Sequence, residues 1–112
     1  MTDILAQNFD SAGDSRIFLD GSKRTVIILK SMAIGRGEYL PGWQWSKHAG
    51  PQTGKDSLTH VGYIVSGQMA VRGADGTEFT VGPNEVFEAQ PGHDAWVVGN
   101  QTCVALDFEH LV

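Results

Sequence analysis

Apolar and polar side chains alternate over short distances along this chain, and turn residues interrupt the pattern every few positions. Residues 77–81 alternate polar and apolar side chains, as expected for a strand with one buried face. No stretch repeats its apolar residues with the spacing of an amphipathic helix. The pattern predicts about nine short strands, which we place at 16–19, 25–34, 38–45, 58–65, 68–72, 77–81, 85–89, 95–98 and 102–108.

Short strands at even spacing, with turn signals between them, predict an antiparallel β-sandwich or barrel. Pro41 lies inside the predicted strand 38–45 and indicates a bulge or an edge position there. Residues 49–55 are too rich in Gly and Pro to pair, so we expect a loop. Residues 1–15 are expected to form an arm or a short helical turn, and residues 16–112 a single domain.

The composition and charge of the chain argue against some classes of protein. The chain has 112 residues, 14 of them glycine, with a net charge of −5 and a pI of about 5.1. The acidic balance argues against a general nucleic-acid binder, and no apolar stretch reaches the roughly 20 residues of a membrane span. Without a basic leader we expect a cytoplasmic protein. The single cysteine, Cys103, stands in an apolar run and is expected to be a buried structural thiol.

Histidines are the main candidates for chemistry. His48, His60 and His93 fall at predicted strand ends or starts, and three imidazoles from separate strands suit a transition metal. Taken one at a time, each is more often a surface or hydrogen-bonded residue than a ligand. On the predicted strand 58–65, strand parity puts His60, Gly62 and Ile64 on one face. His110, close to the end of the chain, is expected to be exposed and is left out of the site.

Two blocks of the chain resemble the two conserved motifs of the cupin superfamily. The first block holds Gly42-Trp-Gln-Trp-Ser-Lys-His48 and His60-Val-Gly-Tyr-Ile-Val-Ser-Gly67, and the second holds Gly82-Pro83-Asn84-Glu85 and Gln90-Pro91-Gly92-His93-Asp94-Ala95-Trp96. The resemblance covers roughly residues 36–108 and is closest to small single-domain cupins of unassigned function. It implies an all-β fold, the double-stranded β-helix or cupin jelly-roll barrel. It also implies a divalent metal held inside the barrel by three His and one Glu.

The chain departs from that ligand set. Gly50 stands where the resemblance places a second His, His60 where it places the Glu, and Ala95 where it places the last His. His93 precedes Ala95 by two residues, a displacement that keeps strand parity and allows an inward side chain. A site of His48, His60 and His93 for Zn, Ni, Fe, Mn or Cu is one alternative. A barrel that kept its pocket without any metal is the other.

Further residues are expected to line the same pocket. They are Gln44, Gly62, Ile64, Glu88, Gln90 and Trp96. Gln90 and Glu88 flank Pro91 and would support a bound imidazole, although a solvent-exposed Glu88 is the simpler interpretation. Trp43, Trp45, Tyr63 and Phe87 are further candidates for apolar walls of this pocket. If His48 points inward, however, parity turns Trp43 and Trp45 outward, where they would form a dimer surface or pack on a second sheet.

These observations favour a small-molecule-binding cupin of unassigned activity, with or without a divalent metal. The alternative is a metal-dependent enzyme, such as a dioxygenase, isomerase or lyase acting on a small organic acid, with Asp94 and Glu88 as candidate bases. The sequence leaves open whether the protein is an enzyme. We expect a small-molecule ligand and a homodimer, and neither nucleic acid nor a membrane as a partner. A subunit devoted to partner contacts through its tryptophans is a third hypothesis.

Overall fold

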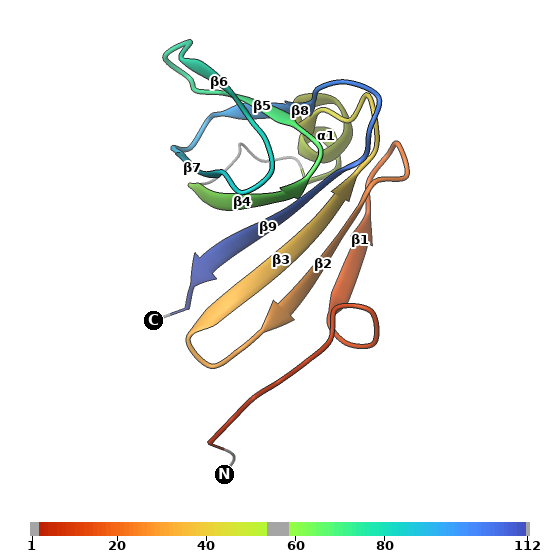
Figure 1. Cartoon of the computed structure of the whole chain (residues 1–112), viewed down its shortest axis with the longest axis vertical. Coiled ribbons are helices and arrows are strands. Elements are labelled where there is room, and N and C mark those ends of the chain that lie inside the picture. Colours follow the sequence, from red (N-terminus) through yellow and green to blue (C-terminus); the bar gives the residue numbers. More distant parts are fainter. Residues whose placement is uncertain (1–2, 54–58, 112) are drawn as a thin grey trace.

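The computed structural model describes residues 3–53 and 59–111. Nine antiparallel strands form two sheets (Figure 1). Along the chain they are β1 (Asp14–Ile17), β2 (Lys23–Ile28), β3 (Met32–Tyr39), β4 (His60–Ser66), β5 (Met69–Arg72), β6 (Glu78–Val81), β7 (Val86–Ala89), β8 (Asp94–Val97) and β9 (Cys103–His110). A helical turn, Trp45–Ala49, and the one-turn helix α1 (Gly50–Thr53) lie between β3 and β4.

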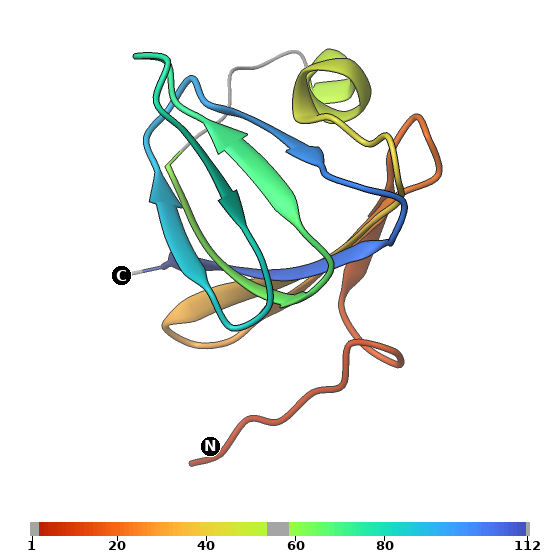
Figure 2. The same cartoon turned by 45° about the horizontal axis from the view of Figure 1, so that its top comes forward.

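The two sheets curl around a common interior. The larger sheet has the strand order β1-β2-β3-β9-β4-β7, and the smaller one has β6-β5-β8. Figure 2 shows β5 and β8 facing the larger sheet across this interior. Strand β3 alternates half-buried and buried positions along its whole length, as one face turned to the core requires. The predicted all-β jelly-roll barrel is therefore confirmed.

Aromatic rings fill one part of the core. The rings of Tyr39 and Trp43 lie 4.2 Å apart between centroids, and Phe18 lies 5.9 Å from Trp43. Ile64 and Cys103 are fully buried beside them. Burial raises the pKa of the Cys103 thiol to about 11, so the predicted structural thiol is confirmed.

The connection from β4 to β5 needs glycine at one position. Gly67 has a φ of +77°, and a Cβ there would lie 2.6 Å from the carbonyl oxygen of Thr102. Both the left-handed backbone and the close approach of the neighbouring chain exclude a larger residue. The Ser-Gly pair that ends the predicted strand 58–65 thus marks a true turn.

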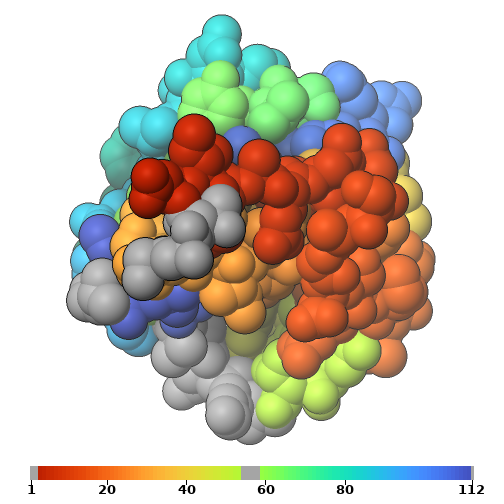
Figure 3. Space-filling view, turned by 90° about the horizontal axis from the view of Figure 1, so that it is seen from below, coloured from red at the N-terminus to blue at the C-terminus, as the bar shows by residue number. Residues whose placement is uncertain are grey.

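The N-terminal segment covers the outer face of the larger sheet. Thr25 and Ile27 point away from the barrel, and both are buried. Phe9 lies under the guanidinium of Arg36, 5.0 Å from ring centroid to Cζ. Figure 3 shows these first residues, in red, lying over the orange strands. Residues 4–8 form no helix, and β1 begins at Asp14.

Two predicted strands are wrong in their extent. The predicted strand 25–34 is two strands joined by a tight hairpin, in which the Leu29 amide donates to the Met32 carbonyl over 2.9 Å. Apolar β-branched residues continue on both sides of this hairpin, so composition did not mark the turn. The predicted strand 38–45 ends at Tyr39, because Pro41 and Gly42 turn the chain out of the sheet.

This turn overturns the prediction of outward tryptophans. Trp43 is 3% exposed and belongs to the core, while Trp45 is half-buried against it. Strand parity does not apply to them, because Trp45 begins a helical turn. The homodimer and the cytoplasmic location stay predictions. The predicted loop 49–55 contains α1, and its last two residues lie outside the described part of the chain.

Candidate functional site

A cavity of about 560 Å³ lies inside the barrel, and we take it as the candidate site. Its wall combines aromatic and aliphatic side chains with polar and charged ones. The aromatic and aliphatic lining includes Phe18, Tyr39, Trp43, Trp45, Ile64, Met69, Phe87 and Phe108. The polar lining includes Arg16, Arg24, Thr53, Thr59, His60, His93, Asp107 and Glu109.

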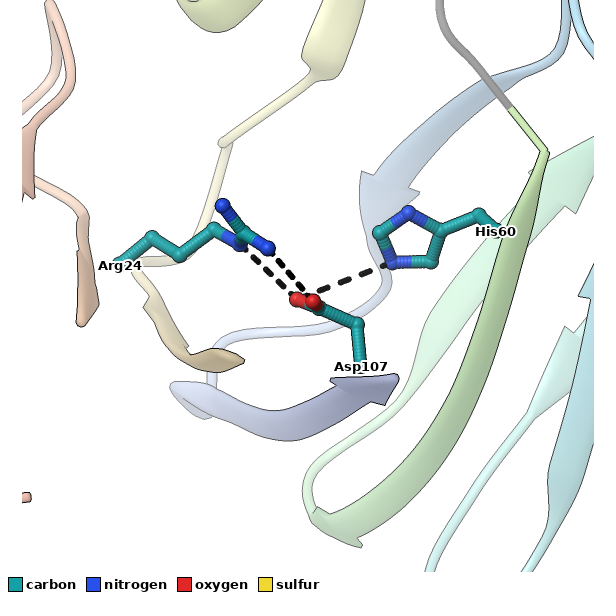
Figure 4. A network of polar contacts seen from close by, with 3 residues as sticks. All are labelled: Arg24, His60 and Asp107. Atoms are coloured by element: carbon teal, nitrogen blue, oxygen red, sulfur yellow. Dashed lines mark hydrogen bonds and ion pairs between the residues drawn. The ribbon is translucent and has the colours of Figure 1, made fainter. Parts of the chain in front are cut away.

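An ion pair forms part of the polar lining of this cavity. Arg24 on β2 donates from Nε and Nη2 to the two carboxylate oxygens of Asp107 on β9, over 2.9 and 2.5 Å (Figure 4). The Asp107 side chain is 8% exposed, and that of Arg24 is 33% exposed. A two-point contact of this kind fixes both side chains and neutralises the buried carboxylate.

Gly35 on β3 leaves the space that the ion pair occupies. Strand β3 lies between β2 and β9, with Gly37 opposite Arg24 and Gly35 opposite Asp107. A Cβ on Gly35 would lie 2.6 Å from one Asp107 oxygen and 2.8 Å from Nε of Arg24. Because Gly35 has no side chain, the two charged groups meet across the intervening strand.

His60 on β4 stands next to this pair. Its Nε2 lies 3.9 Å from Oδ2 of Asp107 (Figure 4), and its ring stacks on Phe87 with centroids 6.1 Å apart. Burial lowers the pKa of His60; Asp107 opposes this shift, and His93 and Arg24 add to it. His60 is therefore a neutral imidazole at pH 7, able to accept or donate one hydrogen bond.

His93 faces His60 across the cavity. It precedes β8, is 7% exposed, and its ring centroid lies 5.9 Å from that of His60. Its Nδ1 lies 2.9 Å from the carbonyl oxygen of Gln90. A carbonyl oxygen only accepts, so Nδ1 carries the proton and Nε2 is the basic nitrogen of the neutral ring. The displaced histidine of the second motif thus points inward.

The third predicted ligand lies elsewhere. His48 belongs to the helical turn Trp45–Ala49 and does not line the cavity, and its Nδ1 accepts the backbone N–H of Gln44 over 3.0 Å. Over residues 3–53 and 59–111, no three His, Cys, Asp or Glu side chains come close enough together to hold a metal ion. The residues present do not fit a site of three His and one Glu, and metal binding stays a prediction.

The other predicted pocket residues divide into three groups. Ile64 lines the cavity, and Gly62 leaves room for Phe87, since a Cβ there would lie 2.5 Å from that ring. Glu88 is exposed on the outer face of β7, and Gln90 offers its carbonyl rather than its exposed side chain.

The last two predicted pocket residues lie outside the barrel. Gln44 and Trp96 line a separate hollow and not the interior cavity. On β8, Ala95 and Val97 point inward, so parity turns Trp96 outward.

The sequence analysis missed Arg24 and Asp107. Asp107 is the one acid in the otherwise apolar stretch 102–108, and a charge in such a stretch is a signal for a buried, paired group. Its partner is 83 residues away in the chain, so no local pattern identified Arg24.

Comparisons with known proteins give matches in structure only. No protein-family model matches the chain, and no curated protein matches its sequence. KdgF from Halomonas sp. is similar over 96% of this chain and 93% of its own, with a TM-score of 0.65 and 18% identity.

Two further similar structures are described as cupins. One is a cupin-2 domain from Rhodospirillum rubrum (TM-score 0.67, 12% identity, 100% of this chain and 78% of that one). The other is described as a sugar phosphate isomerase from a cupin superfamily, from Silicibacter pomeroyi (TM-score 0.67, 15% identity, 93% and 74%). At these identities the similarity establishes the fold and leaves the activity open. The chain therefore has the cupin fold.

Proposed function

We propose that this protein binds a small amphipathic organic molecule inside the barrel. The supporting observation is that His60 lies beside both His93 and the Arg24–Asp107 pair in a cavity that also has a large aromatic and aliphatic lining. A volume of about 560 Å³ is within the range of small-molecule sites. A few fixed polar groups on an apolar wall are the usual means of orienting such a ligand.

The charges of the site indicate how the ligand is held. Arg24 is neutralised by Asp107, and His60 is uncharged at pH 7. His60 therefore acts as a hydrogen-bonding group, and neither His60 nor the Arg24–Asp107 pair offers a net charge to the ligand. We infer a ligand with hydroxyl or carbonyl groups on a compact apolar body, whose apolar part contacts the aromatic wall.

A metal-dependent enzyme is the second candidate. Its support is the facing pair of imidazoles, which offers two ligands for Zn, Ni, Fe, Mn or Cu. Two protein ligands are fewer than a catalytic zinc site normally has, so the organic ligand and water would have to complete the coordination. The neighbour described as a sugar phosphate isomerase suggests that a small sugar or organic acid is worth testing as substrate.

Methyl NMR tests the binding proposal. The δ-methyl of Ile64 and the ε-methyl of Met69 line the cavity and report on its occupancy. Titration with a panel of small polyols, hydroxy acids and cyclic ketones is expected to shift both signals. His60→Ala and His93→Ala are expected to weaken binding at least tenfold by removing a hydrogen bond, and His48→Ala to leave it unchanged. If no compound moves these methyls, the binding proposal fails.

Elemental analysis of the untagged protein tests the second candidate. Stoichiometric metal in the wild type and in His48→Ala, lost in His60→Ala and His93→Ala, would support a site on the facing imidazoles. The metal candidate is excluded by a wild-type protein that stays metal-free after incubation with excess divalent ions. That result would leave the binding proposal standing.

A further inference from the structure

A second hollow lies outside the barrel, on the outer face of the smaller sheet. It has a volume of about 440 Å³. On β5, Met69 and Val71 point into the core, so Ala70 and Arg72 occupy the opposite face. The hollow is lined by Gln44, Arg72, Gly73, Ala74, Gly76, Gly92, Asp94 and Trp96. None of these residues lines the barrel cavity.

Arg72 stands between two acids without forming an ion pair with either. Its cross-strand partners are two acids, Glu78 on β6 and Asp94 on β8. Within residues 3–53 and 59–111, Arg72 makes no ion pair with either of them. An exposed guanidinium presents donors in a planar fork that matches a carboxylate.

The structure explains why Asp94 does not pair with Arg72. Its carboxylate accepts hydrogen bonds from Nε2 of Gln44, from the amide and hydroxyl of Ser46 and from the amide of Ala95, all between 2.7 and 3.0 Å. Partial burial opposes ionisation, but these hydrogen bonds outweigh it and lower the pKa of Asp94. The carboxylate is thus ionised, and its oxygens are engaged away from Arg72.

The indole of Trp96 lines the same hollow as Arg72. Trp96 on β8 is the cross-strand partner of Ala70, two residues from Arg72 on the same face, and it is half-buried. The bridge from Gln44 to Trp96 holds this part of β8 in place. Gly73, Ala74 and Gly76 also line the hollow, and they have no bulky side chains to fill it.

We infer that this hollow is a second ligand site, selective for a flat ring that carries a carboxylate. The carboxylate would pair with the guanidinium of Arg72, and the ring would pack on the indole of Trp96. The inference is independent of the barrel ligand, because the two sites share no residue and the outer one selects by charge.

NMR titration of labelled protein tests this inference. Benzoate is the probe, and benzyl alcohol is the uncharged control compound. The amides of Gly73, Gly76 and Gly92 and the indole N–H of Trp96 report on the outer hollow, and the Ile64 methyl reports on the barrel. Benzoate is expected to shift the outer reporters in a saturable way, at least tenfold more tightly than benzyl alcohol.

Matched variants separate the two contacts. Arg72→Gln is expected to weaken benzoate about tenfold through loss of a charge-assisted contact and to leave benzyl alcohol unchanged. Glu78→Gln removes a nearby negative charge and is expected to tighten benzoate severalfold. Trp96→Leu is expected to weaken both probes. Equal binding of the two probes, shifts confined to Ile64, or wild-type benzoate binding by Arg72→Gln would each overturn the inference.

Discussion

Two arginine–aspartate combinations of this chain have opposite outcomes. Arg24 and Asp107 stand on strands separated by a third strand, yet they form a two-point ion pair inside the barrel. Arg72 and Asp94 are direct cross-strand partners on neighbouring strands, and no ion pair joins them. Closeness in register therefore does not decide whether opposite charges pair.

The two aspartates differ in the side chains that surround each carboxylate. Asp107 lies opposite Gly35 and Gly62, so no neighbouring side chain blocks or replaces the guanidinium of Arg24. Asp94 lies beside Gln44 and Ser46, whose donors occupy its oxygens. Inside the barrel, the charges of the pair cancel, and the histidines are the groups that remain for a ligand. Outside it, the unpaired arginine selects for an anion.

The largest difference in stability between the two sites is expected when the buried carboxylate is removed. Asp107→Asn leaves the charge of Arg24 without its partner and is expected to lower the free energy of unfolding by about 3 kcal/mol, the low end for a buried pair because Arg24 is 33% exposed. Asp94→Asn keeps an acceptor oxygen and is expected to lose only about 1 kcal/mol. Urea unfolding followed by circular dichroism measures both, and equal losses would contradict this account.

A smaller effect is expected from the glycine that lets the inner pair close. Gly35→Ala puts a methyl group into the space of both charged side chains and is expected to cost about 2 kcal/mol. Gly82→Ala is the matched control: its nearest contact would be 3.7 Å, and the cost should stay below about 0.5 kcal/mol. Thermal unfolding of the two variants separates a specific clash from a general effect of replacing glycine by alanine.

The shifted pKa of His60 is expected to make the free energy of unfolding depend on pH. Its pKa in the folded protein is lower than the ordinary value of 6.5, so below about pH 6.5 the unfolded chain takes up a proton that the folded chain does not. The free energy of unfolding should fall as pH drops below 6.5, by at most about 1.4 kcal/mol per pH unit from this group. His60→Gln should remove that part of the slope in denaturant titrations at several pH values. An unchanged slope would show that His60, despite the facing Asp107, Arg24 and His93, is not shifted.

The smallest effect on stability is expected for the outer arginine. Arg72→Gln should change the free energy of unfolding by less than about 0.5 kcal/mol, because its guanidinium is exposed and joined to no acid. Arg24→Gln, by contrast, leaves Asp107 buried without its partner and should cost several times more. A large loss in Arg72→Gln would mean that the outer charges are coupled after all.

The sequence predicted the barrel and one side of its cavity well. Alternation and turn residues located most strands, and parity correctly put His60, Gly62 and Ile64 on the inward face. Parity also allowed the inward position of His93. These inferences succeeded because the side-chain period of a strand is a local property of the backbone.

The same reasoning failed where the chain left the strand. Pro41 and Gly42 follow the end of β3, so Trp43 lies outside the strand, and Trp45 and His48 belong to a helical turn; strand parity applies to none of the three. Trp43 then becomes core, and His48 bonds to the Gln44 amide outside the cavity. A proline inside an apolar run allowed a bulge, an edge or an exit, and only the packing of the whole barrel selected one.

The sequence by itself determined the class of fold, the burial of Cys103 and the inward face of β4, because these depend on local periodicity and composition. Only the tertiary structure decided that Arg24 meets Asp107 and that Arg72 does not meet Asp94. Such pairing depends on strands brought together from distant parts of the chain and on which other donors reach each carboxylate. The register of the folded barrel sets both conditions, and no short stretch of sequence contains it.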